Sequence, residues 1–383
     1  MFSRFRFHQW LGAATVAAAA GVLLMAIANP RTAAEGAMAD DATPTSSPYR
    51  GFGVPELDAA RLNDAANKWH ANIVRFMMRP QREGRDFCHC SSKEAWQKMM
   101  HDLPGELDVA KQLHVAVVLA LFEAPIEHNP AHLDREALSA YWSDNNNLQA
   151  LTEAWTDVAR ICANRDQVIW LDLVNEPLDW NAPGKSPTNW PSWAQSLINS
   201  IRQIDQRHQI VIEPGDGGLP DGFKSLPRLK GDGLIYSFHQ YEPYPYTMQG
   251  IDAMRDTNRA HEYPQRQLSY PGLYPSGYWD KKRLEGVIRP AVEFQKRYGV
   301  RMYVGEFGVA RWAPGAVNWL RDNIDLYEQH GFDWTYVVFR GSPIWGLEHS
   351  NEFQNPVDLH NSGQYTDRGK LLLDYLSRNA TQP

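Results

Sequence analysis

The strongest constraint on the fold of this chain is a series of eight short apolar runs separated by segments of helical length. Each run suits a strand buried on both faces, and the segments between them carry apolar residues at spacings of three and four. Eight strands that alternate with helices predict an α/β fold, a (β/α)8 TIM barrel, with long loops at its carboxyl-terminal face. The expected strands are Arg50–Val54, Asn72–Met78, Val115–Leu121, Val168–Val174, Gln209–Glu213, Leu234–His239, Arg301–Phe307 and Asp333–Phe339, and the expected helices include Leu148–Ala163 and Trp193–Arg207.

A doubly wound open sheet is the alternative for this alternation of strands and helices. A dinucleotide-binding sheet of that kind would place a glycine-rich phosphate loop after its first strand. Gly51 and Gly53 instead lie inside the first run, and no third glycine follows at the required spacing. The sequence therefore favours the barrel and argues against a dinucleotide site.

Composition narrows the functional classes. The 383 residues include 38 Lys and Arg against 45 Asp and Glu, a formal net charge of −7, and no run of basic residues, which argues against a nucleic-acid partner. Aromatic residues make up 11% of the chain. Trp and Tyr rings can line a carbohydrate groove, although composition alone favours their more common role in core packing.

The first 28 residues have the parts of a secretory signal peptide. Arg4 and Arg6 precede an uncharged stretch from Trp10 to Ala28, which ends in a small-x-small site. The stretch is also long enough for an uncleaved anchor, so membrane attachment is the alternative. We expect an exported protein, periplasmic or secreted, with a flexible lead-in over residues 29–48 and one catalytic domain over residues 49–383.

Polar residues stand where four of the expected strands end. The fourth run closes with Asn175-Glu176-Pro177 and the seventh with Glu306-Phe307-Gly308, while the second carries Arg75 and the sixth ends in His239-Gln240-Tyr241. In a barrel these strand ends meet in one bowl, where active sites form. Burying a Glu is costly unless it is paired, so rim salt bridges are the structural explanation and catalysis is the functional one. The Arg, Asn, His and Tyr residues at the same strand ends favour catalysis.

Two carboxylates in one bowl are the minimum set of catalytic groups for breaking a glycosidic bond. One of them, kept protonated, donates to the leaving oxygen while the other attacks the anomeric carbon. An Arg near the attacking carboxylate would keep it ionised, and a Tyr hydroxyl would orient it. An Asn beside the acid would bind the sugar 2-hydroxyl.

These motifs, together with Ala71-Asn72-Ile73-Val74-Arg75, occur in the order and barrel positions of glycoside hydrolase family 5, and the chain resembles that family from Gly51 to about Gly341. The family is the cellulase and β-mannanase group within the clan A (β/α)8 glycosidases. The resemblance implies a retaining mechanism with Glu176 as acid/base, Glu306 as nucleophile and carboxyl groups about 5–5.5 Å apart. Arg75, Asn175, His239 and Tyr241 match the family's supporting residues.

The chain departs from the family pattern at two strands. The family usually has a His at the end of strand three, where this chain reads Leu119-Ala120-Leu121-Phe122-Glu123, and a Trp platform at strand eight, where it reads Trp334-Thr335-Tyr336-Val337-Val338-Phe339. Trp345 or Phe339 is the candidate replacement for that platform. These changes leave the hydrolytic chemistry intact and leave the substrate open.

Further aromatic residues divide between groove and core. Trp180 and Trp312 follow the two Glu motifs on expected loops, so we favour sugar stacking for both. Trp96, Trp142 and Trp155 lie in helical patterns and are expected in the core, whereas Trp279, Tyr278 and the Tyr241–Tyr246 cluster suit either role equally.

Cys88-His89-Cys90 resembles a fragment of a metal site but lacks partner ligands, so a local disulfide or free thiols are favoured over metal, and Cys162 falls in a helical pattern. Glu213 and Asp216 suit substrate contact or, somewhat better, loop hydrogen bonding. Glu123 and Glu127 are further subsite candidates. The expected chemistry needs neither a metal nor an organic cofactor.

The sequence thus predicts a retaining glycoside hydrolase acting on a β-linked polysaccharide or oligosaccharide, with an endo-β-1,4-glucanase favoured. A β-mannanase, an exo-β-glucosidase and a bacterial exopolysaccharide hydrolase are the alternatives within the family, because one or two subsite residues can switch the sugar. A catalytically silent carbohydrate-binding barrel is the alternative from another class, and it would need neither Glu. The oligomeric state stays open.

Overall fold

The computed structural model describes residues 48–130, 134–251, 268–353 and 365–379. Residues from Ser46 to Pro383 form one compact unit. The expected leader and nearly all of the expected lead-in lie outside the described residues. None of the described helices combines the length and the apolar character needed to cross a bilayer.

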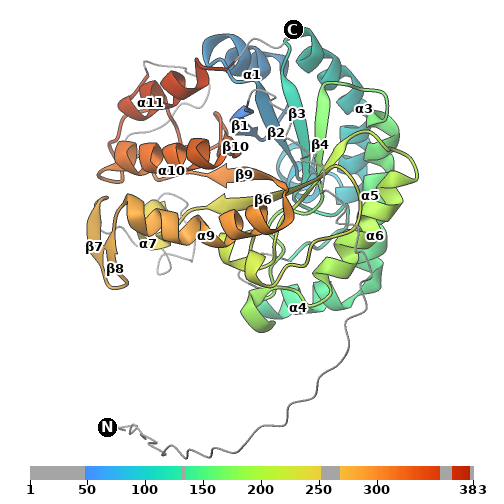
Figure 1. Cartoon of the computed structure of the whole chain (residues 1–383). Coiled ribbons are helices and arrows are strands. Elements are labelled where there is room, and N and C mark those ends of the chain that lie inside the picture. The colour runs from blue at the N-terminus through green and yellow to red at the C-terminus, as the bar shows by residue number, and fades with distance from the viewer. Residues whose placement is uncertain (1–47, 131–133, 252–267, 354–364, 380–383) are drawn as a thin grey trace, which may run out of the picture. The chain divides into compact units, whose positions relative to one another are not determined.

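Eight parallel strands close into a barrel, as the sequence predicts (Figure 1). Around the barrel the order is β1-β10-β9-β6-β5-β4-β3-β2, so neighbours in space follow the chain. The strands are β1 (Arg50–Val54), β2 (Ile73–Met78), β3 (Ala116–Leu121), β4 (Val168–Asp172), β5 (Gln209–Ile212), β6 (Leu234–Gln240), β9 (Arg301–Phe307) and β10 (Asp333–Tyr336). They match the expected runs to within a few residues at their ends. A separate antiparallel hairpin pairs β7 (Gly272–Tyr274) with β8 (Gly277–Trp279).

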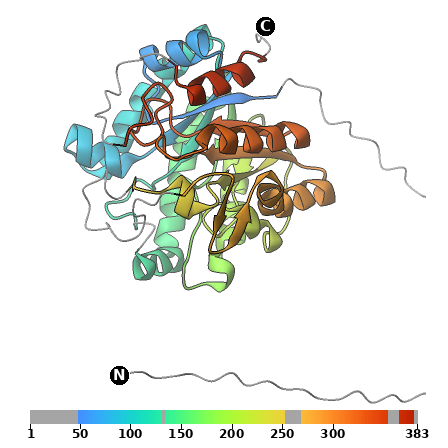
Figure 2. The same cartoon turned by 90° about the vertical axis from the view of Figure 1, so that its left-hand side faces the viewer.

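Helices surround the barrel, and Figure 1 shows α3, α5 and α6 on one side of it and α9, α10 and α11 on the other. In the rotated view of Figure 2, α11 lies beside α10. The helices are α1 (Ala59–Asn63), α2 (Pro80–Glu83), α3 (Ser92–Gln112), α4 (Arg135–Ser143), α5 (Asn145–Cys162), α6 (Trp190–Arg202), α7 (Tyr244–Thr247), α9 (Lys281–Tyr298), α10 (Ala316–His330) and α11 (Asp367–Leu376), with short helical turns η1 (Asp64–Lys68), η2 (Gly84–Cys88), η3 (Pro183–Lys185) and η4 (Pro220–Lys224).

Two apolar cores result. The larger fills the space between strands and helices and includes the expected core residues Trp96, Trp142 and Trp155. The smaller lies inside the barrel, where residues of six strands form an apolar floor: Ile73, Ala116, Val118, Trp170, Val211, Ile235 and Tyr303. Because side chains alternate along a strand, residues two positions after a floor residue also point inward, one layer nearer the carboxyl-terminal face.

Candidate active site

The layer above the floor is polar. Arg75 follows Ile73 by two positions on β2, Asp172 follows Trp170 on β4, and Glu213 comes just after β5, two positions past Val211. On β9 the pairing register with β6 shifts, so that Glu306 lies opposite His239. The strand periodicity therefore gathers charged side chains from five strands or strand ends in the barrel mouth.

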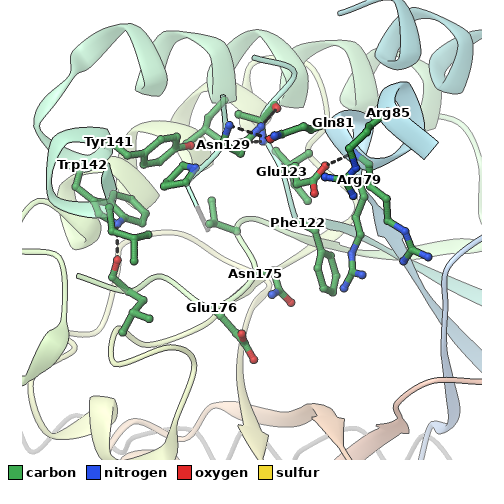
Figure 3. A pocket seen from close by; sticks show the side chains of 18 of the residues that line it. Arg79, Gln81, Arg85, Phe122, Glu123, Asn129, Tyr141, Trp142, Asn175 and Glu176 are labelled. Carbon is green, nitrogen blue, oxygen red and sulfur yellow. Dashed lines mark hydrogen bonds between the residues drawn. The ribbon is translucent and has the colours of Figure 1, made fainter. Parts of the chain in front are cut away.

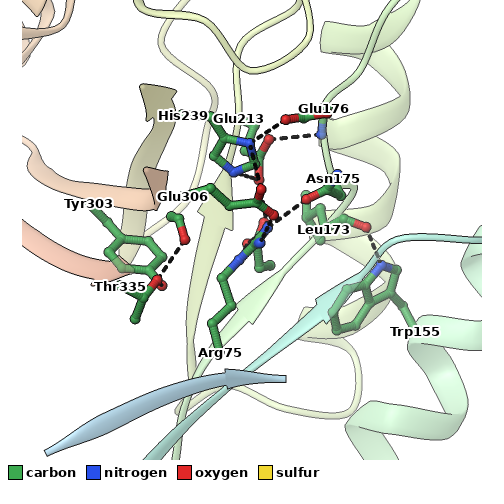
Figure 4. Close-up of polar contacts among 12 residues, drawn as sticks. Arg75, Trp155, Leu173, Asn175, Glu176, Glu213, His239, Tyr303, Glu306 and Thr335 are labelled. Atoms are coloured by element: carbon green, nitrogen blue, oxygen red, sulfur yellow. Dashed lines mark hydrogen bonds and ion pairs between the residues drawn. The ribbon is translucent and has the colours of Figure 1, made fainter. Parts of the chain in front are cut away.

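Arg75 is the centre of this layer, and its side chain is fully buried (Figure 4). Its Nε donates to Asp172 Oδ2 at 2.8 Å and its Nη1 to Glu306 Oε1 at 2.7 Å. Its Nη2 donates to Asn175 Oδ1 at 3.0 Å and to Glu213 Oε1 at 2.9 Å. One guanidinium thus fixes the positions of three carboxylates and an amide, using the planar fork that distinguishes Arg from Lys.

Glu306 is held as a carboxylate. Burial is the largest influence on its pKa and raises it, but the charges of His239 and Arg75 and a hydrogen bond from Tyr241 outweigh burial and lower the pKa below its ordinary value. The Tyr241 hydroxyl donates to Glu306 Oε2 at 2.7 Å. Both oxygens of Glu306 are therefore bound to donors that favour its charged form.

Glu176 lies across from Glu306 and contacts a different partner. His239 Nδ1 lies 2.7 Å from Glu176 Oε1, and the backbone N–H of Glu176 donates to Glu213 Oε2 at 2.8 Å. The left-handed φ of 51° at Glu176 turns the chain at this point, so that side chain and backbone N–H both reach the barrel mouth. The Glu176 side chain keeps 16% exposure, whereas that of Glu306 keeps 8%.

His239 links the two halves of the site. Burial lowers its pKa most, but the neighbouring charges of Glu213 and Glu306 and its contacts with Glu176 and Glu213 raise the pKa well above the ordinary value. Its Nε2 lies 3.2 Å from Glu213 Oε1, an ion-pair distance without hydrogen-bond geometry. Gly218 makes room for this arrangement: a Cβ there would lie 2.8 Å from Glu213 Oε2, and its φ is +72°.

Ligand atoms of Glu176, His239 and Glu306 all lie within 4.8 Å of one another. Such a cluster could in principle hold a metal ion. Here a cationic imidazole and the Arg75 guanidinium, 2.7 Å from Glu306, already supply positive charge where a cation would sit. The donor set suits a carboxylate pair better than a metal site.

A cavity of about 480 Å³ opens beside this pair (Figure 3). Asn175, Glu176 and Glu306 line its inner end, and Phe122 and Glu123 contribute from the end of β3. Figure 3 shows Tyr141 and Trp142 on one side of the cavity and Arg79 and Arg85 on the other. The volume suits part of a small ligand or a few sugar units of a longer one.

The predicted stacking aromatics lie elsewhere. Trp180, Trp312 and Trp345 are not among the residues that line this cavity. Arg135 and Lys185 cover the Trp180 ring, and Trp312 Nε1 donates to Gln249 at 2.6 Å.

The Trp345 ring lies 5.9 Å from that of Tyr241, but Trp345 is only 6% exposed. Phe339 is buried and stacks on Phe52. Tyr141 and Trp142, from α4, are the aromatic residues that face the cavity together with Phe122. Of the aromatics that suited either role, Trp279 is buried while Tyr278 is 58% exposed.

Two side chains at the barrel mouth, Asp172 and Arg79, did not stand out in the sequence. Glu213 is fully buried, pairs with Arg75 and accepts a hydrogen bond from the Glu176 backbone N–H, which agrees with the preference for hydrogen bonding over substrate contact. Asp172 was not singled out, although a charged residue inside an apolar strand was the available signal. Burial raises the pKa of Asp172 to about 7 against the opposing effect of Arg75, and its Oδ1 has no hydrogen-bond partner among the described residues. Arg79, on the cavity wall, gave no sequence signal.

The remaining candidate residues differ in whether they line the cavity and in what they contact. Glu123 lines the cavity and accepts a hydrogen bond from the Arg82 backbone N–H at 3.0 Å, whereas Glu127 is exposed and does not line it. Asp216 pairs with Lys185 at 3.5 Å. Cys88 and Cys90 form the expected local disulfide, and Cys162 is a free, buried thiol.

A (β/α)8 barrel with two glutamates facing each other across its carboxyl-terminal mouth is an arrangement suited to glycoside hydrolysis. Sequence comparison identifies the group of glycoside hydrolases. Residues 38–341 match the family model described as cellulase (glycosyl hydrolase family 5), and the chain belongs to this family. The predicted family, fold and enzyme class are thereby confirmed.

Individual relatives are distant. The chain is 25% identical over 273 residues to Endoglucanase C of Acetivibrio thermocellus, a match covering 66% of this chain and 75% of that protein. A solved glycoside hydrolase structure has a TM-score of 0.66 at 22% identity and covers 86% of this chain and 99% of its own. The cellulose synthase subunit Z of Clostridioides difficile has a TM-score of 0.63 at 18% identity, with the same coverage. At these identities the structural matches show the fold alone.

Proposed function

We propose that the protein is a retaining β-glycosidase that cleaves a β-linked polysaccharide by double displacement, with an endo-β-1,4-glucanase as the favoured activity. The observation that carries the proposal is the facing pair of Glu176 and Glu306, with ligand atoms no more than 4.8 Å apart. Retaining glycosidases separate their two carboxyl groups by about 5–5.5 Å, whereas inverting enzymes need about 6.5–9.5 Å to admit a water molecule.

In the first step, the Glu306 carboxylate attacks the anomeric carbon and the bond to the leaving oxygen breaks. Glu176 gives its proton to that oxygen, which leaves as a hydroxyl. In the second step, Glu176 removes a proton from water, the water oxygen attacks the anomeric carbon, and Glu306 departs as a carboxylate. Cationic His239, 2.7 Å from Glu176, stabilises the Glu176 carboxylate that exists between the steps.

The supporting residues have matching roles in this proposal. Arg75 and Tyr241 keep Glu306 ionised and aimed, because both donate to its oxygens. Asn175 is held by Arg75 at the inner end of the cavity, where its amide N–H can bind the sugar 2-hydroxyl. Trp180, Trp312 and Trp345 stay candidates for stacking sugars outside the described cavity.

The glucan preference rests on sequence similarity to an endoglucanase over two-thirds of the chain. We further propose that residues 1–28 direct export, with cleavage favoured over anchoring, that residues 29–48 serve as a lead-in, and that residues 49–383 act as one catalytic domain. An exported location suits an enzyme whose polymeric substrate lies outside the cytoplasm.

The test is a product profile of the purified protein on carboxymethylcellulose, mixed-linkage β-glucan, glucomannan and galactomannan, with Glu306→Ala as the blank. We expect hydrolysis of the glucans, a rapid fall in viscosity and no turnover by the variant. Activity on mannans alone would replace the glucanase assignment with a mannanase. Wild-type activity in Glu306→Ala would contradict the nucleophile assignment.

A further inference from the structure

The cavity wall opposite Tyr141 and Trp142 is cationic (Figure 3). Three Arg residues at intervals of three line this wall: Arg79 directly before α2, Arg82 in α2 and Arg85 in η2. The chain as a whole has a net charge of −7, so these three residues differ in sign from the chain's average. Three guanidinium groups on one wall repel one another unless negative groups lie nearby, so their counter-ions have to be identified.

Two of the three already have a counter-ion. Arg85 forms a bidentate pair with Asp86 at 2.6 Å and 3.1 Å, and Arg82 Nε lies 3.7 Å from the same carboxylate. Arg85 is also 66% exposed, so water screens its charge. These two residues are explained as a solvated surface cluster.

Arg79 differs from its neighbours. Among the described residues it forms no salt bridge within 4.0 Å, although its side chain is half-buried. Burial lowers its pKa most, while the more distant charges of Glu306 and Glu123 raise it. Those two carboxylates have other partners, since Glu306 is bound by Arg75 and Glu123 by the Arg82 backbone N–H. Within the described part of the chain, Arg79 is therefore a charged group in the cavity wall without a counter-ion in direct contact.

The Phe122 ring holds the Arg79 guanidinium in position. The Arg79 Cζ lies 4.2 Å from the centroid of the Phe122 ring, and the Arg75 Cζ lies 4.9 Å from the same centroid. Stacking on an aromatic face stabilises a guanidinium and holds its plane while leaving its N–H groups free at the edge. Phe122 follows β3 directly and lines the same cavity, so its ring holds the Arg79 guanidinium beside the cavity.

We propose that Arg79 is a specificity-determining residue that binds an anionic substituent, a carboxylate or a phosphate ester, on the sugar unit beside Glu306. The preferred substrate is then a β-linked glycan that carries acidic groups. A planar guanidinium forms paired hydrogen bonds with both kinds of anion, and neither Arg82 nor Arg85 is as free to do so. This inference rests on the proposed glycosidase function and narrows its substrate class.

Binding of defined oligosaccharides tests the inference without depending on turnover. The protein carries Glu176→Gln to prevent hydrolysis, and its dissociation constants are measured by calorimetry for cellotetraose, for the same oligosaccharide oxidised to carboxylates at C6, and for a phosphorylated form. We expect the anionic ligand to bind about tenfold more tightly than the neutral one, the ratio expected for one charge-assisted hydrogen-bonded contact. The carboxylate and phosphate arms show which anion is recognised.

Single substitutions test whether Arg79 causes the preference for the anionic ligand. Arg79→Gln should bring the ratio of the two dissociation constants close to one, mainly by weakening binding of the anionic ligand, and Arg79→Lys should keep part of the preference. Arg289→Gln, which removes an exposed Arg on α9 with a side chain 71% exposed, is the matched control and should change neither constant. Thermal unfolding of each variant shows whether the fold is intact.

Equal binding of neutral and anionic ligands would overturn the inference. So would an equal loss of both on Arg79→Gln, because Arg79 would then act through Glu306 and not on the substrate. Failure of the proposed function has a different signature, the absence of hydrolysis of any β-glycan, neutral or acidic, by the unmodified protein.

Discussion

At the scale of single residues, the two glutamates differ in their surroundings more than in their chemistry. Glu306 accepts hydrogen bonds from Arg75 and Tyr241, whereas Glu176 is more exposed and contacts His239. Two identical side chains with such different partners can divide the acid and nucleophile roles between them.

Glu176→Ala tests the acid role. We expect about a 100-fold or larger loss of kcat/KM on β-glucan and a much smaller loss on aryl glycosides with good leaving groups, which need little protonation. Steady-state rates on both substrate types measure the difference. Equal losses on the two types would contradict the assignment. Glu293→Ala, at an exposed site on α9, should change neither rate.

Tyr241→Phe tests how Glu306 is kept ionised. The Tyr241 hydroxyl lowers the pKa of Glu306, so removing it should raise that pKa. Because attack needs the ionised form, the acid limb of the kcat/KM profile should move to higher pH by about one pH unit or more. Tyr278→Phe, at a side chain 58% exposed, is the control and should leave the profile in place. An acid limb that stays in place or moves to lower pH would contradict this role.

At the scale of elements, strand periodicity explains which parts of the fold and site could be predicted from the sequence and which could not. The barrel and the residues at its strand ends could be predicted, because apolar runs and the polar residues that close them are local signals. Asp172 and Glu213 could not be ranked, because a buried carboxylate has meaning only beside its partner, and Arg75 lies 97 and 138 positions away in the chain.

The aromatic residues show how little sequence position says about location in space. Trp180 and Trp312 follow the glutamate motifs closely in sequence, but loop conformation places them outside the lining of the cavity. Trp142 was expected in the core from its helical pattern, and it is both buried and part of the cavity wall. Sequence proximity to a catalytic motif is a weak guide to position in a long loop.

The turn between α6 and β5 provides a stability test. Asp205 accepts hydrogen bonds from the backbone N–H groups of Arg207 and His208 at 2.9 Å and 3.0 Å and also contacts the His208 ring. We expect Asp205→Ala to lower the free energy of unfolding by about 2–3 kcal/mol, measured with urea at neutral pH. Asp166→Ala, whose carboxylate pairs with Arg207 at the exposed surface, should cost less than about 1 kcal/mol.

The same residue gives a pH dependence of known sign. Burial raises the pKa of Asp205, but the hydrogen bonds from His208 and Arg207 outweigh burial and lower the pKa from 3.8 to about 2. A lowered carboxyl pKa stabilises the fold above the unfolded value, and this contribution is lost as pH falls from about 4 to about 2. The stability difference between wild type and Asp205→Ala should shrink over that range, and a constant difference would contradict the account.

At the scale of the whole molecule, the compact unit from Ser46 onward holds every residue of the proposed site. A chain that begins at Pro48 should therefore fold and retain the kcat/KM of the full-length protein. The full-length protein, expressed in a host with a secretory pathway, should be recovered with Asn29 at its amino terminus, as determined by mass spectrometry. Recovery of the intact chain in the membrane fraction would favour the anchor instead.

The central claim is a double displacement through Glu306, and the stereochemistry of the first product tests it most directly. Proton NMR during the first minutes of hydrolysis of a β-linked oligosaccharide separates the two anomers before they interconvert. The account predicts that the β-anomer forms first and the α-anomer appears only later by mutarotation. Initial formation of the α-anomer would show single displacement by water and would contradict the roles assigned to Glu176 and Glu306.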